Sequence, residues 1–427
     1  MSILSQLNHL KESNYAWPEA QVDYLQALKG AGVKVRSILE ALLSDSELSE
    51  SDAVTLFETK ENDLLAVLSV ADKVRQDRVG DQVTFVINRN INFTNICYMG
   101  CKFCNFAKRA DSPEAESLSP VEVAKRAHEA WLRGATEVCI QGGLHPKIPG
   151  NYYRDILKAI KHEVPEIHIH AFSPFEVWYG AKKMRMEYGE FISDLKSNGL
   201  GSMPGTAAEI LDTEVRKVLT QDKLSAEKWV EVISAAHQVG LPSTATIMYG
   251  HIDQPKQWAS HIALIRDIQK VTGGFTEFVP LGFIHKDSRL YKDVPGVRPG
   301  PTLDENLKMH AISRLMLKGW IDNIQVSWVK LGPEVAQAIL NCGANDFGGT
   351  LMNESISRSA GAQWGQEVMP REMTGIIRGA GRIPAQRSTL YKTITVYKDR
   401  DASETTPLVS RKEASAAHMV ARRSWLT

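Results

Sequence analysis

The chain has 427 residues, with 50 basic and 50 acidic side chains and a formal net charge of zero. This length can bury a large core, and the charge balance gives no electrostatic reason to expect nucleic acid or an anionic membrane as a partner. No stretch approaches the roughly 20 apolar residues that span a bilayer. The N-terminus lacks a secretion signal, and the five cysteines indicate a reduced, cytoplasmic protein without disulfides.

Residues 1–80 are predicted to form an N-terminal helical extension, in which two or three helices follow a polar start. Within residues 63–75, apolar side chains recur on one helical face. Ser49 with Asp52 resembles a capping pair before an apolar run.

Residues 81–362 are predicted to form an α/β barrel. From about residue 83, short β-branched runs alternate with longer helical segments, which predicts βαβ units and a parallel sheet. Eight such units in about 265 residues fit a closed (βα)8 barrel of the TIM type. Ser119 with Glu122 and Thr302 with Glu305 form capping-box patterns. The candidate strands are residues 83–87, 137–140, 167–172, 200–203, 243–249, 275–281, 323–329 and 344–347.

Residues 363–427 are predicted to form a C-terminal extension of helical and irregular structure. A helix is expected over residues 371–378, with Gly379 placed to end it. A basic, proline-containing segment then runs to Tyr391, and residues 399–427 are expected to be loosely ordered.

Three cysteines follow the first predicted strand with the spacing C-x-x-x-C-x-x-C: Cys97, Cys101 and Cys104. Three thiolates can hold three irons of a 4Fe–4S cluster and leave the fourth iron open for a small molecule. Radical S-adenosylmethionine (SAM) enzymes use this arrangement to bind and cleave SAM. A zinc site usually takes four ligands, whereas Cys139 and Cys342 stand alone. Cys139 lies in an apolar run and is predicted to be a core residue.

Gln141, Gly142 and Gly143 close the second predicted strand. Adjacent glycines allow a ligand to approach the backbone and leave carbonyl groups free to accept from an ammonium group. Radical SAM enzymes hold the SAM amino group with a glycine-rich stretch here, which this chain matches in part. The alternative is an ordinary β–α turn.

Two glutamates each follow a capping hydroxyl by three residues: Glu176 after Ser173, and Glu209 after Thr206. A capping box at the start of a helix explains both pairs without any ligand. Each carboxylate would also stand at the C-terminal face of the barrel, where it could accept hydrogen bonds from the SAM ribose. Ser173, Glu176 and Glu209 are therefore candidate cofactor-binding residues beside residues 141–143.

Polar residues interrupt the predicted strands and turns. His168 and His170 share one face of a strand, which indicates either a polar lumen or satisfied core histidines. Glu277 lies within the sixth strand, where a buried carboxylate is costly unless it is paired, so it is a candidate ligand for a substrate amino group. His145 and His251 lie in turns after strands, where solvated loop residues are the alternative. The catalytic candidates are His145, His170, His251 and Glu277.

Longer stretches around these residues resemble one radical SAM family, the tyrosine-using (CofH-like) subunit of FO synthase, which builds a deazaflavin chromophore. The resemblance covers roughly residues 55–392. Related enzymes of the futalosine route to menaquinone share the barrel and several of these motifs. The matching stretches are residues 95–107, 137–146, 170–177, 204–209, 248–255, 273–281, 323–332 and 345–358.

The resemblance implies a transferase with one 4Fe–4S cluster and SAM. In the family, a 5′-deoxyadenosyl radical abstracts hydrogen from L-tyrosine, and the tyrosine Cα–Cβ bond breaks. The 4-hydroxybenzyl fragment then joins 5-amino-6-(D-ribitylamino)uracil. A second radical SAM subunit closes the ring to FO, and the single cysteine triad implies one half-reaction here. A reductant such as flavodoxin or ferredoxin is also implied.

Three other interpretations stay open at this point. A futalosine-pathway radical SAM enzyme would act on a different substrate. A non-catalytic iron–sulfur carrier usually keeps all four irons ligated, so a cysteine triad within a barrel argues against it. A structural zinc protein would lack the absorption of an iron–sulfur cluster.

Overall fold

The computed structural model describes residues 23–220 and 222–398, so the predicted tail 399–427 lies outside the described residues. Between residue 23 and the first strand the structure has four helices, more than the two or three expected. Ser49 Oγ accepts a hydrogen bond of 3.1 Å from the Asp52 N–H, which confirms the predicted cap. The helices are α2 (Tyr24–Gly30), α3 (Val33–Leu43), α4 (Glu50–Phe57) and α5 (Glu61–Val79).

The strands form a parallel ring with eight positions among the described residues, as the sequence predicts. The named strands of the ring are β1 (Gln82–Val86), β2 (Asn88–Asn92), β3 (Glu137–Gln141), β4 (His168–Ala171), β5 (Ser243–Tyr249), β6 (Phe275–Gly282) and β7 (Asp346–Gly349). β1 and β2 together make the first position. Parallel ladders join β2 to β3, β3 to β4, β5 to β6 and β1 to β7.

Single bridges supply the rest of the ring. Ser202 pairs with β4 and Met203 with β5, while Ile324 pairs with β6 and Gln325 with β7. The predicted strands 200–203 and 323–329 are therefore present as positions in the ring but are much shorter than expected. A further bridge joins Arg89 of β2 to Met352, just beyond β7.

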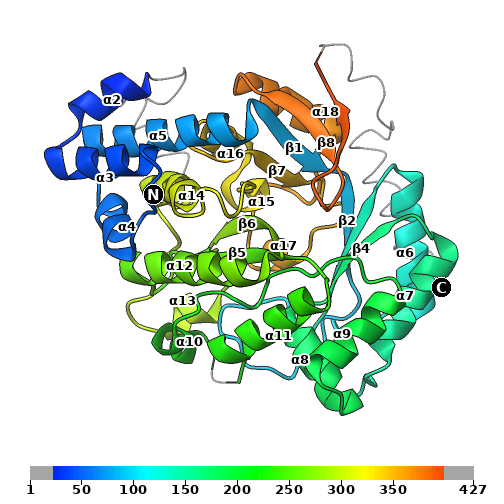
Figure 1. Ribbon diagram of the computed structural model, residues 1–427. Helices are drawn as coiled ribbons and strands as arrows, with labels where there is room; N and C mark the ends of the chain where they lie inside the picture. Colours follow the sequence, from blue (N-terminus) through cyan, green and yellow to red (C-terminus); the bar gives the residue numbers. More distant parts are fainter. Residues whose placement is uncertain (1–22, 221, 399–427) are drawn as a thin grey trace.

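Helices cover the outside of the ring (Figure 1). Ser119 and Thr302 both form the predicted capping boxes. The helices that follow β2 are α6 (Pro120–Leu132), α7 (Tyr152–Glu163), α8 (Pro174–Met184), α9 (Tyr188–Ser197), α10 (Thr213–Leu219), α11 (Ala226–Gln238), α12 (Pro255–Thr272), α13 (Arg289–Asp293), α14 (Leu303–Met316), α15 (Trp328–Leu331), α16 (Pro333–Ile339), α17 (Ile356–Ser359) and α18 (Pro370–Gly379).

The C-terminal extension contains strands that the sequence analysis missed. After α18, β8 (Ile383–Arg387) pairs in parallel with β1, and β9 (Thr393–Val396) pairs antiparallel with β8. The prediction of irregular structure up to Tyr391 is therefore wrong. Pro384 obscured the strand because proline donates no ladder hydrogen bond, yet its carbonyl accepts one from the Tyr397 N–H at 2.9 Å.

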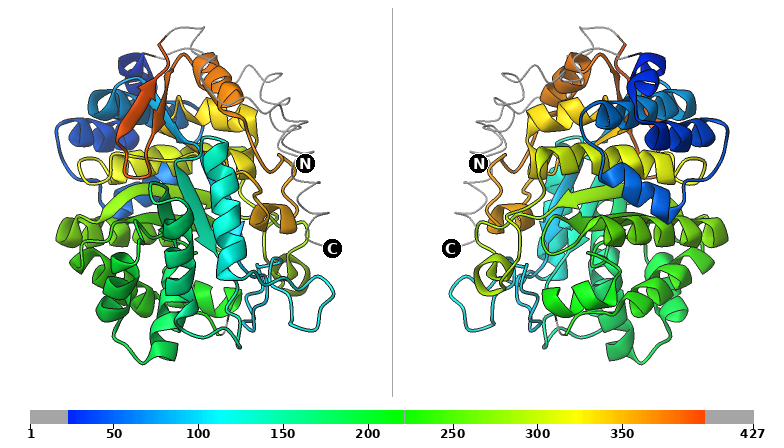
Figure 2. Two further views of the ribbon diagram at one scale, coloured as in Figure 1. Left: turned by 90° about the vertical axis from the view of Figure 1, so that its right-hand side faces the viewer. Right: turned by 90° about the vertical axis from the view of Figure 1, so that its left-hand side faces the viewer.

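The two ends of the barrel carry different segments. Figure 2 shows the β8–β9 hairpin at one end of the molecule and the long loop after β2 at the other. That loop leaves the carboxyl end of the barrel strands, where the active sites of such barrels lie. Among the helices of residues 23–220 and 222–398, none combines the length and apolar character that crossing a membrane requires.

Candidate active site

The three clustered cysteines lie on the loop after β2, which closes on itself at its base. The Asn95 N–H donates to the Glu116 carbonyl at 3.2 Å, and Asn95 Oδ1 accepts from the Glu116 N–H at 2.7 Å. Cys97, Cys101 and Cys104 are all partly exposed. The fold therefore holds three thiols on one pinned loop at the carboxyl end of the barrel.

Backbone N–H groups point at two of the sulfur atoms. Cys97 Sγ accepts from the backbone of Met99 and Leu144, and Cys104 Sγ also accepts from two backbone N–H groups. Burial raises the pKa of all three thiols, and these N–H donors oppose it for Cys97 and Cys104 because they favour the thiolate. Such donors suit thiolates that ligate a cluster, because hydrogen bonds to the sulfur atoms tune the cluster's reduction potential.

Lys223 brings a positive charge to the same loop. Its Nζ lies 4.9 Å from the ring centroid of Phe103 and 2.5 Å from Glu209 Oε1. The ammonium group lowers the pKa of all three clustered thiols, against the larger effect of burial. Sequence analysis missed Lys223 because nothing in its local sequence marks a lysine that lies against a distant cysteine loop.

Glu209 does not open a helix, so the capping box predicted for Thr206 and Glu209 is wrong. The next helix, α10, begins at Thr213 with Asp212 as its cap. Glu209 has a positive φ of 40° and forms ion pairs with Lys223 and, at 3.7 Å, with Arg216 Nη1. It is 8 % exposed, so a charged carboxylate is held close to the cysteine loop.

The glycine turn after β3 packs directly against the cysteine loop. A Cβ on Gly143 would meet the Ile96 carbonyl oxygen at 2.4 Å, and one on Gly142 would meet the Phe93 ring at 2.5 Å. Their N–H groups are used, by Glu176 and by the Thr94 carbonyl respectively. The carbonyl oxygens of Gly142 and Gly143 accept no hydrogen bond within the described residues.

Glu176 forms the predicted capping box at the start of α8 and also fixes the glycine turn. Its Oε2 accepts from the Ser173 N–H at 2.8 Å and from Ser173 Oγ at 2.6 Å, while Oε1 accepts from the Gly142 N–H at 2.9 Å. Burial raises the pKa of Glu176 to about 7. Both carboxylate oxygens are engaged, so the local role of Glu176 is to position the turn.

Gln141 ends β3 beside these glycines. Its Oε1 lies 3.4 Å from Thr206 Oγ1, and its carbonyl accepts from Asn92 Nδ2 at 3.2 Å. The side chain faces the lumen with Glu137 and Cys139, because alternate residues of a strand share a face.

Below the strand ends, the lumen is lined by polar side chains. Asn90, Cys139 and His170 pair in register across β2, β3 and β4. Ser202 Oγ lies 2.7 Å from His170 Nδ1 and 2.8 Å from His168 Nε2. Cys139 is partly exposed on this face, so the prediction of a core position for it is wrong. Burial lowers the pKa of His170 to about 4, which leaves the ring neutral.

Glu277 lies near the N-terminal end of the lumen with residues of the C-terminal extension. The Tyr391 hydroxyl donates to Glu277 Oε2 at 2.5 Å, and Arg387 Nη2 lies 3.7 Å from the same oxygen. Arg387 also binds Asp346 of β7 through both Nε, at 2.5 Å, and Nη2, at 3.0 Å. Burial raises the pKa of Glu277 to about 7, although Arg387 opposes the shift. We call Glu277, Asp346, Arg387 and Tyr391 the floor network.

The two remaining histidine candidates lie outside the lumen network. His251 is fully buried, with Nδ1 2.9 Å from Asp253 Oδ1 and Nε2 3.0 Å from the Met248 carbonyl. It is neither solvated nor free to contact a substrate. His145 follows the glycine turn, and its Nδ1 accepts from the Lys147 N–H at 3.0 Å.

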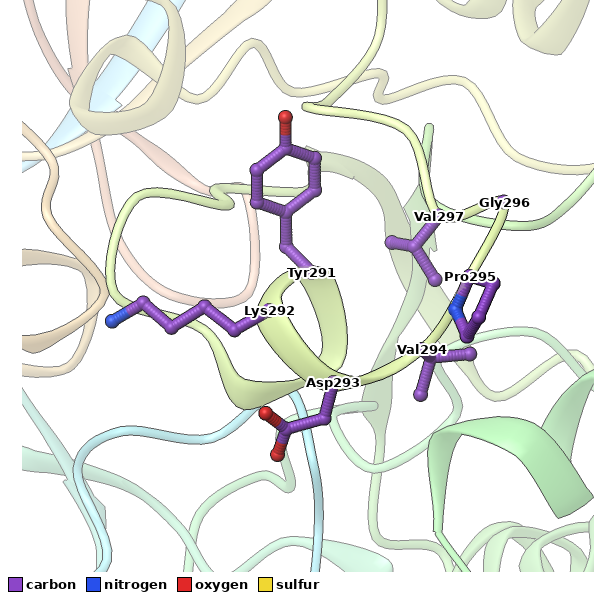
Figure 3. A pocket seen from close by; sticks show the side chains of 7 residues that line it. All are labelled: Tyr291, Lys292, Asp293, Val294, Pro295, Gly296 and Val297. Atoms are coloured by element: carbon purple, nitrogen blue, oxygen red, sulfur yellow. The ribbon is translucent and has the colours of Figure 1, made fainter.

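A pocket of about 510 Å³ lies on the outside of the barrel, lined by the consecutive residues 291–297 of α13 and the segment after it (Figure 3). Its segment is tied to the cysteine loop, because the Leu290 N–H donates to the Lys102 carbonyl at 2.8 Å. The pocket contains none of the clustered cysteines and none of the lumen residues, so it is separate from the candidate active site.

Comparison with known proteins gives the family. Residues 91–265 match the radical SAM superfamily, and residues 272–400 match the CofH/MqnC C-terminal region. The chain is 50% identical over 354 residues to the 5-amino-6-(D-ribitylamino)uracil–L-tyrosine 4-hydroxyphenyl transferase of Methanocaldococcus jannaschii, covering 82% of this chain and 98% of that protein. The chain belongs to the FO synthase family of radical SAM enzymes.

Other FO synthase family members are much longer than this chain. The FO synthase of Mycobacterium leprae is 54% identical over 328 residues, which cover 77% of this chain and 38% of that protein. The FO synthase of Streptomyces coelicolor is 48% identical over 372 residues, covering 87% and 43%. The chain therefore spans about two fifths of the length of these relatives.

Solved radical SAM structures share the fold. Methylornithine synthase (PylB) matches with a TM-score of 0.62 and 19% identity, covering 81% of this chain and 95% of that one. The FeFe-hydrogenase maturase HydG from Carboxydothermus hydrogenoformans matches with a TM-score of 0.64 and 15% identity, covering 91% and 85%. The predicted barrel fold is thus confirmed, and the family match over residues 91–265 assigns it to the radical SAM superfamily.

Membership of the radical SAM superfamily brings a 4Fe–4S cluster and SAM as cofactors, and the residues present fit both. Three thiols, two of them with backbone N–H donors, suit a cluster, and the two unpartnered glycine carbonyls suit an ammonium group. In the part of the chain that the structure describes, no three His, Cys, Asp or Glu side chains converge as ligands of one metal ion would. Cysteines that each bind a different iron need not converge in that way.

Proposed function

We propose that this chain transfers the 4-hydroxybenzyl group of L-tyrosine to 5-amino-6-(D-ribitylamino)uracil, one half of FO biosynthesis. The observation that carries this proposal is the alignment with the Methanocaldococcus jannaschii transferase, which spans 98% of that protein at 50% identity. By contrast, the matched part is only 38% of the Mycobacterium leprae FO synthase. One barrel with one cysteine triad supports a single half-reaction.

In this proposal, Cys97, Cys101 and Cys104 hold the cluster. The carbonyls of Gly142 and Gly143 accept from the SAM amino group, and Ser173 and Glu176 hold that turn in place. Glu209, with its partner Lys223 and with Gln141 nearby, provides the polar groups for the rest of SAM. When bound, the cluster and SAM supply a carbon radical that removes hydrogen from tyrosine.

The lumen residues do the remaining work of positioning. A radical must be kept from water and from other hydrogen donors, and a closed barrel serves that need. His170 and Glu277 face the lumen and are the substrate-contacting candidates that this proposal retains. His251 instead holds the turn after β5, and His145 belongs to the turn beside the cysteine loop.

The proposal requires two further proteins. A second radical SAM enzyme must close the ring to FO, and a low-potential reductant such as flavodoxin or ferredoxin must supply the electron. The length of the curated FO synthases, of which this chain matches about two fifths, supports a partner for the other half-reaction.

An anaerobic assay tests the proposal. Protein with a reconstituted cluster is incubated with dithionite, SAM, L-tyrosine and the ribitylaminouracil, and the products are identified by mass spectrometry. We expect a hydroxybenzyl–uracil adduct with 5′-deoxyadenosine, and neither product from Cys101→Ala. Formation of 5′-deoxyadenosine without the adduct would show that the proposed substrates are wrong. A futalosine-pathway enzyme would give that result.

A further inference from the structure

Three polar atoms that face the lumen have no hydrogen-bond partner within the described residues. They are Glu277 Oε1, His170 Nε2 and Asn90 Oδ1. Asn90 Oδ1 is buried, whereas Glu277 Oε1 and His170 Nε2 keep some accessible surface on side chains that are only 7 % and 8 % exposed. A buried polar atom without a partner, such as Asn90 Oδ1, is costly, and a ligand in the lumen could supply hydrogen bonds to all three atoms.

The three atoms come from strands on different sides of the barrel. Asn90 and His170 stand in one register layer, with Cys139 between them. Glu277 belongs to β6, which lies across the lumen from β3, yet its charge acts on the Cys139 thiol. The charge of Arg387, a member of the floor network, likewise reaches His170 and lowers the pKa of its ring. The unpartnered atoms therefore face a shared space rather than three separate ones.

The groups around this space suit hydroxyls better than a fixed charge. Arg387 is matched by Asp346, one Glu277 oxygen is already bound by Tyr391, and the Glu137 carboxyl on the same lumen face accepts a hydrogen bond from Asn88 Nδ2 at 2.8 Å. His170 is neutral, because burial lowers its pKa to about 4. Burial raises the pKa of Glu277 to about 7, so near neutrality its carboxyl can donate as well as accept. A hydroxyl group can meet both kinds of partner.

The floor of this space, at Glu277, lies far from the reacting end of the site, and His170 lies between the two. Glu277 precedes Gly282, the end of β6, by five residues, or about 16 Å of strand. His170 pairs with Cys139, two residues or about 7 Å below Gln141 at the end of β3. The tyrosine atom that loses hydrogen must lie beside the cysteine loop, because the radical arises there. A substrate tail, and not the reacting amino acid, should occupy the deep part of the lumen.

We propose that Glu277, His170 and Asn90 bind the neutral hydroxylated side chain of the aminouracil substrate, with Tyr391 as the residue that positions Glu277. This inference rests on the proposed function. It adds that the hydroxylated side chain of the aminouracil binds at the floor of the barrel. It assigns a specificity role to a residue of the C-terminal extension, because Tyr391 lies beyond the strands of the ring.

Equilibrium binding to the full-length, cluster-reconstituted protein tests this assignment under anaerobic conditions. Two probes are compared by titration calorimetry: 5-amino-6-(D-ribitylamino)uracil, and 5,6-diaminouracil, which lacks the hydroxylated chain. We expect the first to bind at least about tenfold more tightly, a difference that one or two hydrogen bonds supply.

Variants separate hydroxyl recognition from ammonium recognition. Glu277→Met combined with Tyr391→Phe removes both members of a bonded pair, so neither is left unsatisfied, and it should bring the preference to within about twofold. His170→Ala on the opposite wall should weaken it independently. Glu277→Gln, which can still donate and accept, should keep most of the preference. Glu334→Met, at an exposed position of α16, is the matched control.

The outcomes are distinguishable. Equal binding of the two uracils by the parent protein, or an unchanged preference in both the double variant and His170→Ala, would overturn the assignment. So would a large rise in KM for tyrosine in Glu277→Gln with the uracil preference intact, because that pattern marks an ammonium site. Iron content and Tm of each variant verify folding. If the parent protein with an intact cluster forms no adduct, the proposed function fails instead.

Discussion

Gly143 is the residue at which the turn after β3 touches the cysteine loop. A Cβ added there would lie 2.4 Å from the Ile96 carbonyl oxygen and 2.9 Å from Cys97 Cβ. We expect Gly143→Ala to destabilise the fold by about 1–3 kcal/mol and to lower the iron bound per chain, because the loop must move away. Gly375→Ala in α18 meets no atom within 4 Å and is the control. Full iron content in Gly143→Ala would contradict this account.

The Glu277 carboxyl should make folding stability depend on pH. Burial raises its pKa from 4.5 to about 7, so the folded chain binds this proton more tightly than the unfolded chain does. The stabilisation is complete below about pH 4.5, falls as the pH rises, and is lost above about pH 7. Between pH 5.5 and pH 7.5, the free energy of unfolding of Glu277→Gln should rise by roughly 2 kcal/mol relative to that of the parent protein, because the glutamine side chain cannot titrate.

Anaerobic urea unfolding at the two pH values measures this difference. Glu334→Gln, at an exposed position, should follow the parent protein at both. A constant difference between Glu277→Gln and the parent would mean that Glu277 does not keep its proton in the folded chain.

At the scale of residues, sequence reasoning identified groups by type and spacing but not by environment. The cysteine triad could be predicted because its ligands are close in sequence. His251 has the same local pattern as a solvated turn residue, yet it is fully buried against Asp253. Lys223 acts on cysteines about 120 residues away in sequence, and only tertiary packing brings these groups together.

A buried ion pair adds to the strand pairing that holds the C-terminal hairpin to the barrel. Arg387 of β8 is 2 % exposed, and Asp346 of β7 is fully buried. Removing one partner leaves the other charge buried and unpaired, so Arg387→Met should cost about 3–5 kcal/mol. The double variant Arg387→Met with Asp346→Asn should recover part of this loss.

Denaturation midpoints of the single and double variants measure this coupling. Lys228→Met breaks an exposed pair with Glu231, and it should change stability by less than about 1 kcal/mol. An Arg387→Met loss no larger than that of Lys228→Met would show that the hairpin is held by its strand pairing with β1 alone.

At the scale of elements, the alternation of strands and helices was enough to predict a closed barrel. The lengths of the strands could not be predicted in this way, because the ring needs only one bridge on each side at Ser202–Met203 and at Ile324–Gln325. Propensity alone cannot tell a full strand from such a bridge. The hairpin was missed for a related reason: β8 contains Pro384 and ends in a charged residue, and its partner β1 lies about 300 residues away.

At the scale of the whole molecule, the barrel has two different ends. The floor network, with Arg387 and Tyr391 from the C-terminal extension, occupies the N-terminal end and ties β6 to β7. The cysteine loop and the glycine turn stand at the other end. If substrates pass only through the cysteine end, bound SAM must lie across their path.

This arrangement predicts ordered binding. With an unreduced cluster, so that no turnover occurs, SAM should slow the dissociation of the ribitylaminouracil by at least about tenfold, because the exit is covered. Stopped-flow displacement with excess unlabelled ligand measures the rate. In a Cys97→Ser, Cys101→Ser, Cys104→Ser variant, which cannot hold the cluster that anchors SAM, the effect should vanish. Equal dissociation rates with and without SAM in the parent protein would mean that the aminouracil leaves past the floor network. The C-terminal hairpin would then open to release it instead of keeping that end of the barrel closed.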